Sequence, residues 1–318
     1  MIKRTLYFGN PSYLSLKQGQ LVLRLPEVEK NDTLPESFRK EAHATIPVED
    51  IGVVVLDHQQ ITITQGLMEA LLENNCALIT CDHQRLPVGL MLPLCGNTTQ
   101  TERFRYQLQA SQPLQKQLWQ QTIVAKIENQ AAVLRDVRGV NVTNMQRWAG
   151  DVRSGDTMNL EARAAAFYWK EAFPMIENFV RDREGIAPNN MLNYGYAILR
   201  AVVARALVGS GLLPTWGMHH RNKYNAYCLA DDVMEPYRPF VDKLVMKLYD
   251  KYGSIETLER EHKVSSPTYP QMDDMAPSHH QPNSKHYIYC DGAYPMWATI
   301  HYPPMLEPPQ HAILHNHN

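Results

Sequence analysis

The sequence has few cysteines, and their spacing is not typical of disulfide pairs or of a zinc site. Its 318 residues include five cysteines, an odd number without paired CxxC spacing. Neither a disulfide framework nor a zinc cage is therefore favoured. A glycine-rich phosphate-binding loop is also missing. These absences exclude small disulfide-stapled folds and give no sign of a nucleotide cofactor.

Long apolar runs are missing as well. No stretch approaches the roughly 18 apolar residues that a membrane span needs, and Met1-Ile2-Lys3-Arg4 leads directly into TLYFGN without an apolar signal core. With 44% hydrophobic residues, the chain is long enough for one large domain or two ordinary ones. We expect two domains, a cytoplasmic protein and no membrane partner.

The chain lacks the strong positive charge that is typical of many nucleic-acid binders, since its formal net charge is -2. The charge is unevenly spread, however. Residues 102–223 hold sixteen Lys and Arg against ten Asp and Glu, while the remainder holds fifteen against twenty-three. Solvated helix faces would explain this difference as well as a DNA surface would, so charge permits DNA binding without requiring it.

Short apolar segments with turn residues between them dominate residues 1–93 and predict a small β-rich domain. The segments are TLYFG, YLSL, QLVLRL, IGVVVL, ITIT and CALIT. One helix is expected inside this domain, over residues 65–74, before a strand over 77–80. Residues 87–101 are rich in Pro, Gly and polar residues, which places a linker at 94–101.

A helical period begins beyond the linker and predicts an all-α domain over residues 102–262. One helix is expected to start near Asp156, capped by Ser154, Asp156 or Thr157, and to carry Glu161 at the head of an inward-looking face. Another should start after residues 188–190 and stop at Gly209 and Gly211. The fold class is therefore α+β, with an irregular Pro-, His- and Tyr-rich tail over residues 263–318.

Residues 217–239, GMHHRNKYNAYCLADDVMEPYRP, concentrate metal-ligating and basic side chains. Two histidines, two aspartates and a glutamate suit a divalent ion, and the nearby Arg and Lys residues suit phosphates. Asp232 and Glu235 are three residues apart on a helix that Pro236 should end or kink, so both carboxylates can point the same way. A surface histidine pair and an acidic helix cap are the plainer alternatives.

Four ordered motifs carry a family resemblance: NLEARAAAFYW, LNYGYAILRA, GLLPTWGMHHRNKYN and ADDVMEPYRPFVDKLV. They resemble the CRISPR-associated spacer-acquisition integrase, the first family of Cas proteins, over residues 1–260. The segment HHRNKYNAYCLADDVMEPYRPFVD is most similar to members that accompany the type II RNA-guided effector nuclease.

The resemblance implies a metal site made of Glu161, His220 and Glu235, which would also be the catalytic residues. His219 is the neighbour that a one-residue shift in register would select instead of His220. Asp232 matches a supporting aspartate that some members place three residues before the second acidic ligand. Ala162 replaces a glycine found in many members, and Met218 replaces the usual aromatic residue.

The chemistry of these residues agrees with the resemblance. Phosphodiester transfer needs a divalent ion, for which oxygen ligands favour Mg²⁺ or Mn²⁺, and one imidazole shifts the preference towards Mn²⁺. Candidate phosphate contacts around the site are Arg163, Arg221, Lys223 and Arg238. Trp216 is a candidate base-stacking residue, whereas Tyr168 and Tyr194 are better explained as core.

The resemblance further implies a homodimer built by the β-rich domain, which acts with a dimer of the small second Cas protein. Its expected reaction inserts short foreign duplexes into a CRISPR array through attack by their 3′ hydroxyls, in antiviral defence. The expected partners are pre-spacer DNA, the CRISPR repeat and, as a further candidate, the type II effector nuclease. Two alternatives remain: a non-catalytic DNA-binding scaffold of the same complex, and another metal-dependent phosphohydrolase.

Overall fold

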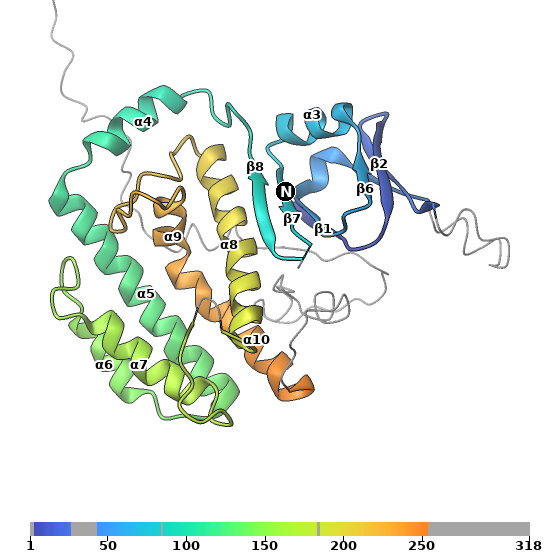
Figure 1. Ribbon diagram of the computed structural model, residues 1–318. Helices are drawn as coiled ribbons and strands as arrows, with labels where there is room; N and C mark the ends of the chain where they lie inside the picture. Colours follow the sequence, from blue (N-terminus) through green and yellow to red (C-terminus); the bar gives the residue numbers. More distant parts are fainter. Residues whose placement is uncertain (1–2, 27–42, 84, 183–184, 254–318) are drawn as a thin grey trace, which may run out of the picture.

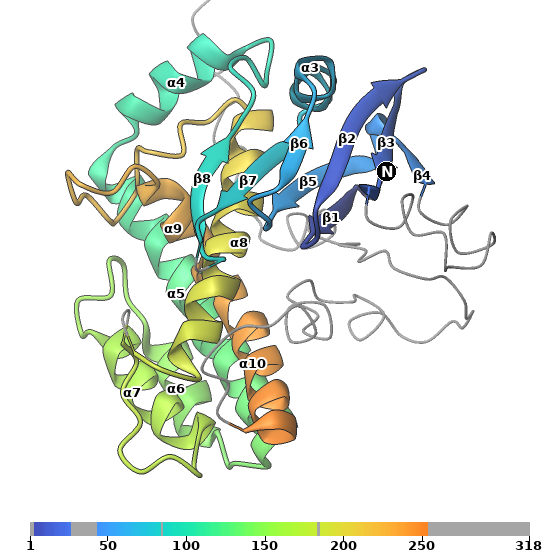
Figure 2. The same cartoon turned by 45° about the vertical axis from the view of Figure 1, so that its right-hand side comes forward.

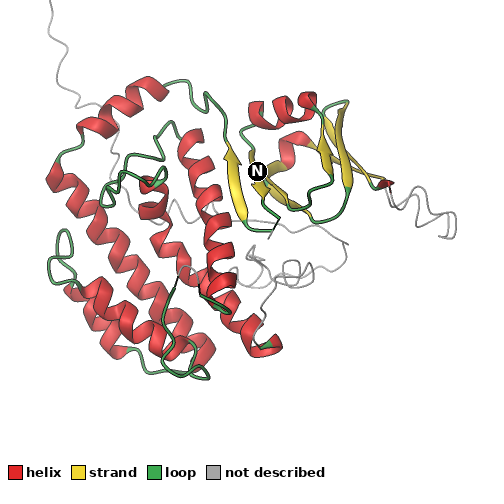
Figure 3. Cartoon of the chain, viewed as in Figure 1, coloured by secondary structure: helices red, strands yellow, loops and turns green. Residues whose placement is uncertain are grey.

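The computed structural model describes residues 3–26, 43–83, 85–182 and 185–253. Figure 1 shows two parts, a strand-rich part within residues 3–91 and a helical part within residues 100–252. Figure 3 separates them by colour, with the strands gathered on one side and most helices on the other. The expected α+β class, with a β-rich N-terminal part before a helical part, is confirmed.

Two four-stranded sheets build the N-terminal part. The first has the order β1-β5-β7-β8 and consists of Arg4–Phe8, Ile51–Leu56, Ala77–Cys81 and Pro87–Met91. The second has the order β4-β3-β2-β6 and consists of His43–Pro47, Gln20–Arg24, Ser12–Lys17 and Ile61–Ile63. In the first sheet β1, β5 and β7 run parallel, and β8 pairs antiparallel to β7. A 3-10 turn, η1 (Val48–Asp50), leads into β5.

Alternating side chains place the two faces of the first sheet in different cores. Leu6, Val54 and Leu78 pack with helix α3 (Gln65–Glu73) and the second sheet. Val53, Val55 and Ile79 on the opposite face pack against helix α8 (Asn189–Gly209). Because successive residues of a strand point to opposite faces, one sheet can join both parts. Figure 2 shows α8 lying beside β7 and β8.

The C-terminal part is a bundle around one long helix, α5 (Gln112–Arg138). Ser111 caps its start and Pro113 occupies its first turn, while Gly139 ends it with a left-handed φ of 65°. Helix α4 (Gln100–Gln109) precedes α5. Around α5 lie α6 (Thr143–Asp151), α7 (Leu160–Ala172), α8, α9 (Cys228–Met234), η2 (Glu235–Tyr237) and α10 (Arg238–Tyr252). Their shared core includes Trp119, Ile123, Tyr168 and Met234.

Most of the expected elements are present. All six apolar segments form strands, and the helix and strand expected at 65–74 and 77–80 are α3 and β7. Asp156 does cap α7, because its carboxylate accepts from the backbone N–H groups of Leu160 and Glu161 at 2.9 and 3.0 Å. Helix α7 itself begins four residues later than expected.

Two expectations need correction. Residues 87–91 were expected to be irregular but form strand β8, which is possible because β8 lies at a sheet edge, where Pro87 and Gly89 are tolerated.

Helix α8 is apolar and long enough, by length and composition alone, to be a candidate membrane span. Since 56% of its most apolar window is buried within the protein, it has the character of a core helix. The tail at 263–318 lies outside the described residues.

A buried carboxylate, Asp242 of α10, lies inside this bundle. The hydroxyls of Tyr168 and Tyr196 both donate to it. Burial raises the pKa of Asp242 to about 7, and the two tyrosine hydrogen bonds and the charges of Arg238 and Arg181 only partly oppose this rise. Tyr168 and Tyr194 are both buried, as their interpretation as core residues predicts.

Candidate metal centre

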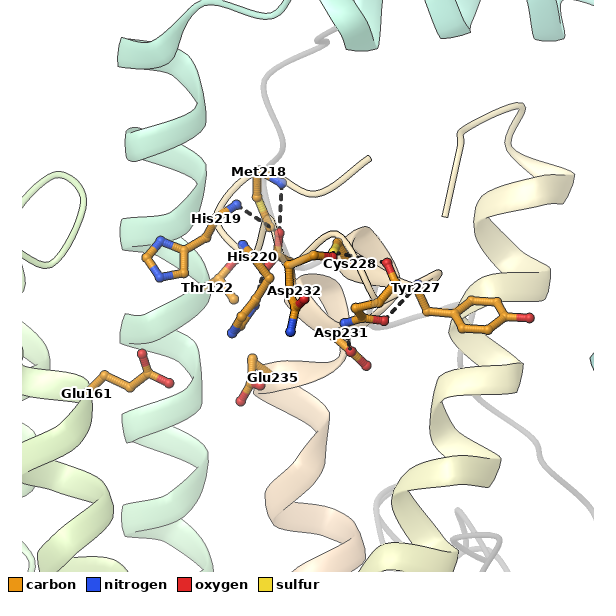
Figure 4. Close-up of polar contacts among 12 residues, drawn as sticks. Thr122, Glu161, Met218, His219, His220, Tyr227, Cys228, Asp231, Asp232 and Glu235 are labelled. Atoms are coloured by element: carbon orange, nitrogen blue, oxygen red, sulfur yellow. Dashed lines mark hydrogen bonds and ion pairs between the residues drawn. The ribbon is translucent and has the colours of Figure 1, made fainter. Parts of the chain in front are cut away.

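Asp232 organises the turn that carries the two histidines. Its Oδ2 accepts from the backbone N–H of Met218 at 2.7 Å and of His219 at 2.9 Å, and its Oδ1 accepts from that of His220 at 3.2 Å. The side chain of Asp232 is 0% exposed, so these donors replace the water that a carboxylate needs. Figure 4 shows this carboxylate at the centre of the turn. Asp232 therefore fixes the backbone around both histidines.

Asp232 also orients one of these two rings. His220 Nδ1 lies 2.5 Å from Asp232 Oδ1, so Nδ1–H donates and, in the neutral ring, the lone pair is on Nε2. This hydrogen bond raises the pKa of His220, against the effect of burial. A carboxylate behind a histidine is the usual support of a metal-binding imidazole. Figure 4 shows the His220 ring directed towards Glu235.

The ring of His219 has a different environment. It stacks on Trp119 of α5, with ring centroids 3.9 Å apart and planes 1° from parallel. Burial lowers its pKa, helped by the neighbouring His220. The stack directs the ring to α5 rather than to the carboxylates, which favours His220 as the candidate ligand.

Gly217 allows the turn to close over Asp232. A Cβ at this position would lie 2.4 Å from the carbonyl oxygen of His220 and 2.9 Å from Asp232 Oδ2. Both distances are shorter than real Cβ contacts, so any side chain here would push the turn away. Glycine is required for the close approach rather than for an unusual φ angle.

Pro236 sets the position of the second acidic residue. It ends α9 and places Glu235 at the start of the 3-10 turn η2, from which α10 continues. The side chain of Glu235 is 7% exposed, and Arg238 Nε lies 3.0 Å from its Oε1. Glu235 and Asp232 do not point to a common site, because both oxygens of Asp232 accept hydrogen bonds from the histidine turn.

Lys126 joins Glu235 to Glu161. Its Nζ lies 2.6 Å from Glu161 Oε1 and 2.6 Å from Glu235 Oε2. The first contact is a hydrogen bond, whereas the second is an ion pair without hydrogen-bond geometry. The two carboxylate oxygens are therefore separated by at most twice this distance, although their residues are far apart in the chain. Figure 4 shows Glu161 extending from α7 towards α5.

The charges of this cluster stabilise one another. Burial by itself would lower the pKa of Lys126, but Glu235 and Glu161 more than offset this, and the pKa is raised. Burial by itself would raise the pKa of Glu235, but Lys126 and Arg238 hold it below its usual value. Glu235 is therefore held in its ionised form, which is the state in which a carboxylate can bind a metal ion.

The donor types fit a divalent ion. Glu161 and Glu235 offer carboxylate oxygens near one point, and His220 offers a ring nitrogen whose tautomer Asp232 fixes. Within the described ranges, no group of three His, Cys, Asp or Glu side chains is already gathered closely enough to hold an ion. The structure instead holds an ammonium group between the two carboxylates.

The candidate phosphate contacts lie in different settings. The guanidinium of Arg163 lies 4.8 Å from the Trp148 ring, and Arg221 donates to Gln115 Oε1 at 2.7 Å. Lys223 is exposed beside Tyr224. Arg238 differs from these three, because its guanidinium is paired with Glu235 and lies over the Tyr196 ring. Trp216, the candidate stacking residue, is 49% exposed.

Lys126 is the site residue that the sequence reasoning missed. Its neighbours along one face of α5 are the buried Ile123, Ile127 and Gln130. A lysine on a buried stripe needs an anionic partner, because an unpaired buried charge is costly. The stripe was thus a signal that Lys126 meets a carboxylate, although it did not indicate which one.

The model of the family described as CRISPR associated protein Cas1 matches residues 7–257, most of the chain. The chain belongs to the Cas1 family. It is 40% identical over 252 residues to the CRISPR-associated endonuclease Cas1 of Neisseria meningitidis serogroup C (strain 8013). That alignment covers 79% of this chain and 77% of the relative, so the family resemblance seen in the sequence is confirmed.

Solved structures share the Cas1 fold at low sequence identity. A Cas1 protein from Thermotoga maritima has a TM-score of 0.63 at 16% identity, covering 85% of this chain and 90% of that one. A casposase bound to integration product has a TM-score of 0.59 at 21% identity, covering 79% and 73%. A Cas6-RT-Cas1–Cas2 complex has a TM-score of 0.58 at 19% identity, covering 79% and 28%.

Proposed function

We propose that this Cas1-family chain is a metal-dependent DNA endonuclease and integrase that inserts short duplexes into a CRISPR array. The observation that carries the proposal is the convergence of Glu161 and Glu235 on one cation, beside a histidine held by Asp232. Family membership and the name of the Neisseria relative, an endonuclease, support DNA as the substrate.

In the proposed reaction, the 3′ oxygen of the incoming strand attacks a phosphorus atom of the CRISPR repeat. The new P–O bond forms as the bond to the repeat's own 3′ oxygen breaks, and the proton of the attacking hydroxyl is lost while the leaving oxygen gains one. The number of phosphodiester bonds is unchanged, so the step needs no nucleotide cofactor.

The roles of the protein residues follow from their positions. Glu161, His220 and Glu235 would hold Mg²⁺ or Mn²⁺, and Asp232 keeps the Nε2 lone pair of His220 free for ligation. A bound ion would supply positive charge that stabilises the negative charge developing on the phosphoryl oxygens. Arg238 pairs with Glu235 and, after Lys126, helps to hold the pKa of that carboxylate below its usual value.

The DNA would be held by side chains around this site. Arg163, Arg221 and Lys223 are the proposed phosphate contacts, which position DNA without reading its sequence. The solved structures of a casposase with its integration product and of a Cas1–Cas2 complex support DNA and Cas2 as partners. A homodimer formed through the β-rich part, the type II effector nuclease as a partner and a cytoplasmic location remain predictions.

The test compares Glu161→Gln with wild type in an integration assay. Labelled pre-spacer duplex and a supercoiled CRISPR-array plasmid are incubated with Mn²⁺, with and without Cas2. We expect Glu161→Gln to lose integration while retaining DNA binding. The control Glu128→Gln makes the same charge change at an exposed position on α5 and should integrate normally.

Other outcomes separate the alternatives. DNA binding without any integration or cleavage by the wild type would favour the non-catalytic scaffold. Hydrolysis of small phosphoesters, without action on the plasmid, would favour another metal-dependent phosphohydrolase. Full integration by Glu161→Gln would remove this residue from the mechanism.

A further inference from the structure

Lys126 stands where two carboxylates of the proposed metal site meet. Its side chain is 12% exposed, and the same Nζ contacts Glu161 and Glu235 at 2.6 Å each. The contact is built by the fold, because α5 packs against both α7, which carries Glu161, and η2, which carries Glu235. Lys126 is therefore placed between these two elements by helix packing rather than by its own flexibility.

The cluster needs a cation at this point. Without one, two ionised carboxylates would face each other in a poorly hydrated site, and like charges at such separations repel strongly. Arg238 contacts the other oxygen of Glu235 and lies over Tyr196, so it cannot separate Glu235 from Glu161. The Lys126 ammonium is the group that keeps the pair together.

A lysine ammonium and a divalent ion compete for the same two carboxylate oxygens. An ammonium has no lone pair with which to join a metal's ligand shell, and two cations sharing one pair of carboxylates repel. The lysine stem has four rotatable carbons, so the head group can leave without movement of the helix. Ion binding at Glu161 Oε1 and Glu235 Oε2 therefore competes with the Lys126 contacts.

We propose that Lys126 is an internal cation that holds the metal site together before the ion arrives, and that it competes with the ion for Glu161 and Glu235. The inference rests on the proposed function, since it concerns the same site. It makes Lys126 a positioning residue rather than a metal ligand. As a consequence, Lys126 keeps the ion-free site ordered and lowers the affinity of the site for the ion.

The experiment measures Mn²⁺ binding directly, by electron paramagnetic resonance of free Mn²⁺, together with the melting temperature with and without Mn²⁺. Lys126→Met removes the charge and keeps a long apolar stem. We expect it to melt at lower temperature than wild type without metal, and to bind Mn²⁺ at least about tenfold more tightly, because the charge-assisted contacts need no longer break. The gap in melting temperature should close at saturating Mn²⁺.

Two controls isolate the charge at this position. Lys116→Met makes the same change at an exposed position on α5 and should match wild type in both measurements. Lys126→Arg keeps the positive charge and should retain wild-type or weaker Mn²⁺ affinity. If Lys126→Met does not fold, Lys126→Gln replaces it, since its neutral amide can still donate to one carboxylate.

The outcomes distinguish this inference from the function on which it rests. Equal or weaker Mn²⁺ binding by Lys126→Met, or a loss of stability that saturating Mn²⁺ does not reduce, would overturn the role of Lys126 alone. No Mn²⁺ binding by wild type, or binding that is unchanged in Glu161→Gln, would overturn the metal site and the inference with it. Tighter binding by Lys126→Met and loss of binding by Glu161→Gln would support both.

Discussion

Asp232→Asn tests whether a buried carboxylate sets both the fold and the chemistry of the histidine turn. Each oxygen of Asp232 meets two donors: Oδ2 meets the N–H groups of Met218 and His219, and Oδ1 meets the N–H and the Nδ1 of His220. Asparagine has one acceptor oxygen, so its NH₂ group must face one of these two pairs. The substitution therefore loses two backbone contacts in one orientation and one in the other.

The two orientations have different costs. With the NH₂ group towards Met218 and His219, two partly buried N–H groups lose a charged acceptor, at about 1.5–3 kcal/mol each. The free energy of unfolding should then fall by about 3–6 kcal/mol. With the NH₂ group towards His220, the backbone N–H of His220 loses its acceptor. Nδ1 of His220 must then accept a hydrogen bond from the NH₂ group, so the ring proton moves to Nε2. That orientation costs about half as much stability but removes the lone pair that a metal ion needs.

Urea unfolding and Mn²⁺ titration together detect either outcome. We expect Asp232→Asn to lose at least about 1.5 kcal/mol of stability and about 10- to 100-fold in Mn²⁺ affinity. The control is Asp151→Asn, whose carboxylate is 59% exposed and lies 3.8 Å from the exposed Arg147, and which should change by less than about 1 kcal/mol. If Asp232→Asn kept both stability and Mn²⁺ affinity, Asp232 would not organise this site.

Two further predictions use the same methods. Gly217→Ala should lose at least about 2 kcal/mol of stability and much of its Mn²⁺ affinity, because its Cβ would lie 2.4 Å from a carbonyl oxygen. The control is Gly150→Ala in α6, where a Cβ meets no described atom within 4 Å. This control should gain up to about 1 kcal/mol of stability. An unharmed Gly217→Ala would contradict the close packing of the turn. Because the pKa of Asp242 rises from 3.8 to about 7 on folding, the native state keeps a proton that the unfolded chain releases. The free energy of unfolding should therefore fall as pH rises from about 4 to 7, by on the order of 4 kcal/mol, and Asp242→Asn should remove this slope; an equal slope in Asp242→Asn would assign it to other groups.

Local patterns were enough to predict most of the fold. Strand alternation and helical spacing are set by neighbouring residues, so they identified six strands and the helices that carry Glu161 and Tyr196. Strand β8 was missed because Pro87 and Gly89 weaken the local signal, and only its position at a sheet edge makes them acceptable. Strand β4 was missed as well.

The site was less accessible to local reasoning. Glu161, His220 and Glu235 were selected through family resemblance, and a one-residue shift in register would have selected His219 instead of His220. The stack of His219 on Trp119 depends on how α5 packs against the turn, which spacing does not encode. Lys126 was missed for the same reason, since its two partners are brought to it by two different helical elements.

Helix α8 has a consequence for how this protein can be dissected. One side of the helix contributes Tyr194, Ile198 and Ala201 to the core against the first sheet, and another contributes Leu192, Tyr196 and Val203 to the core of the bundle. A fragment cut at residues 94–101 would expose the first set as an apolar strip on a helix that also supports the site. The helical part is thus a poor candidate for expression by itself. Fragments should be designed to keep the first sheet attached to α8.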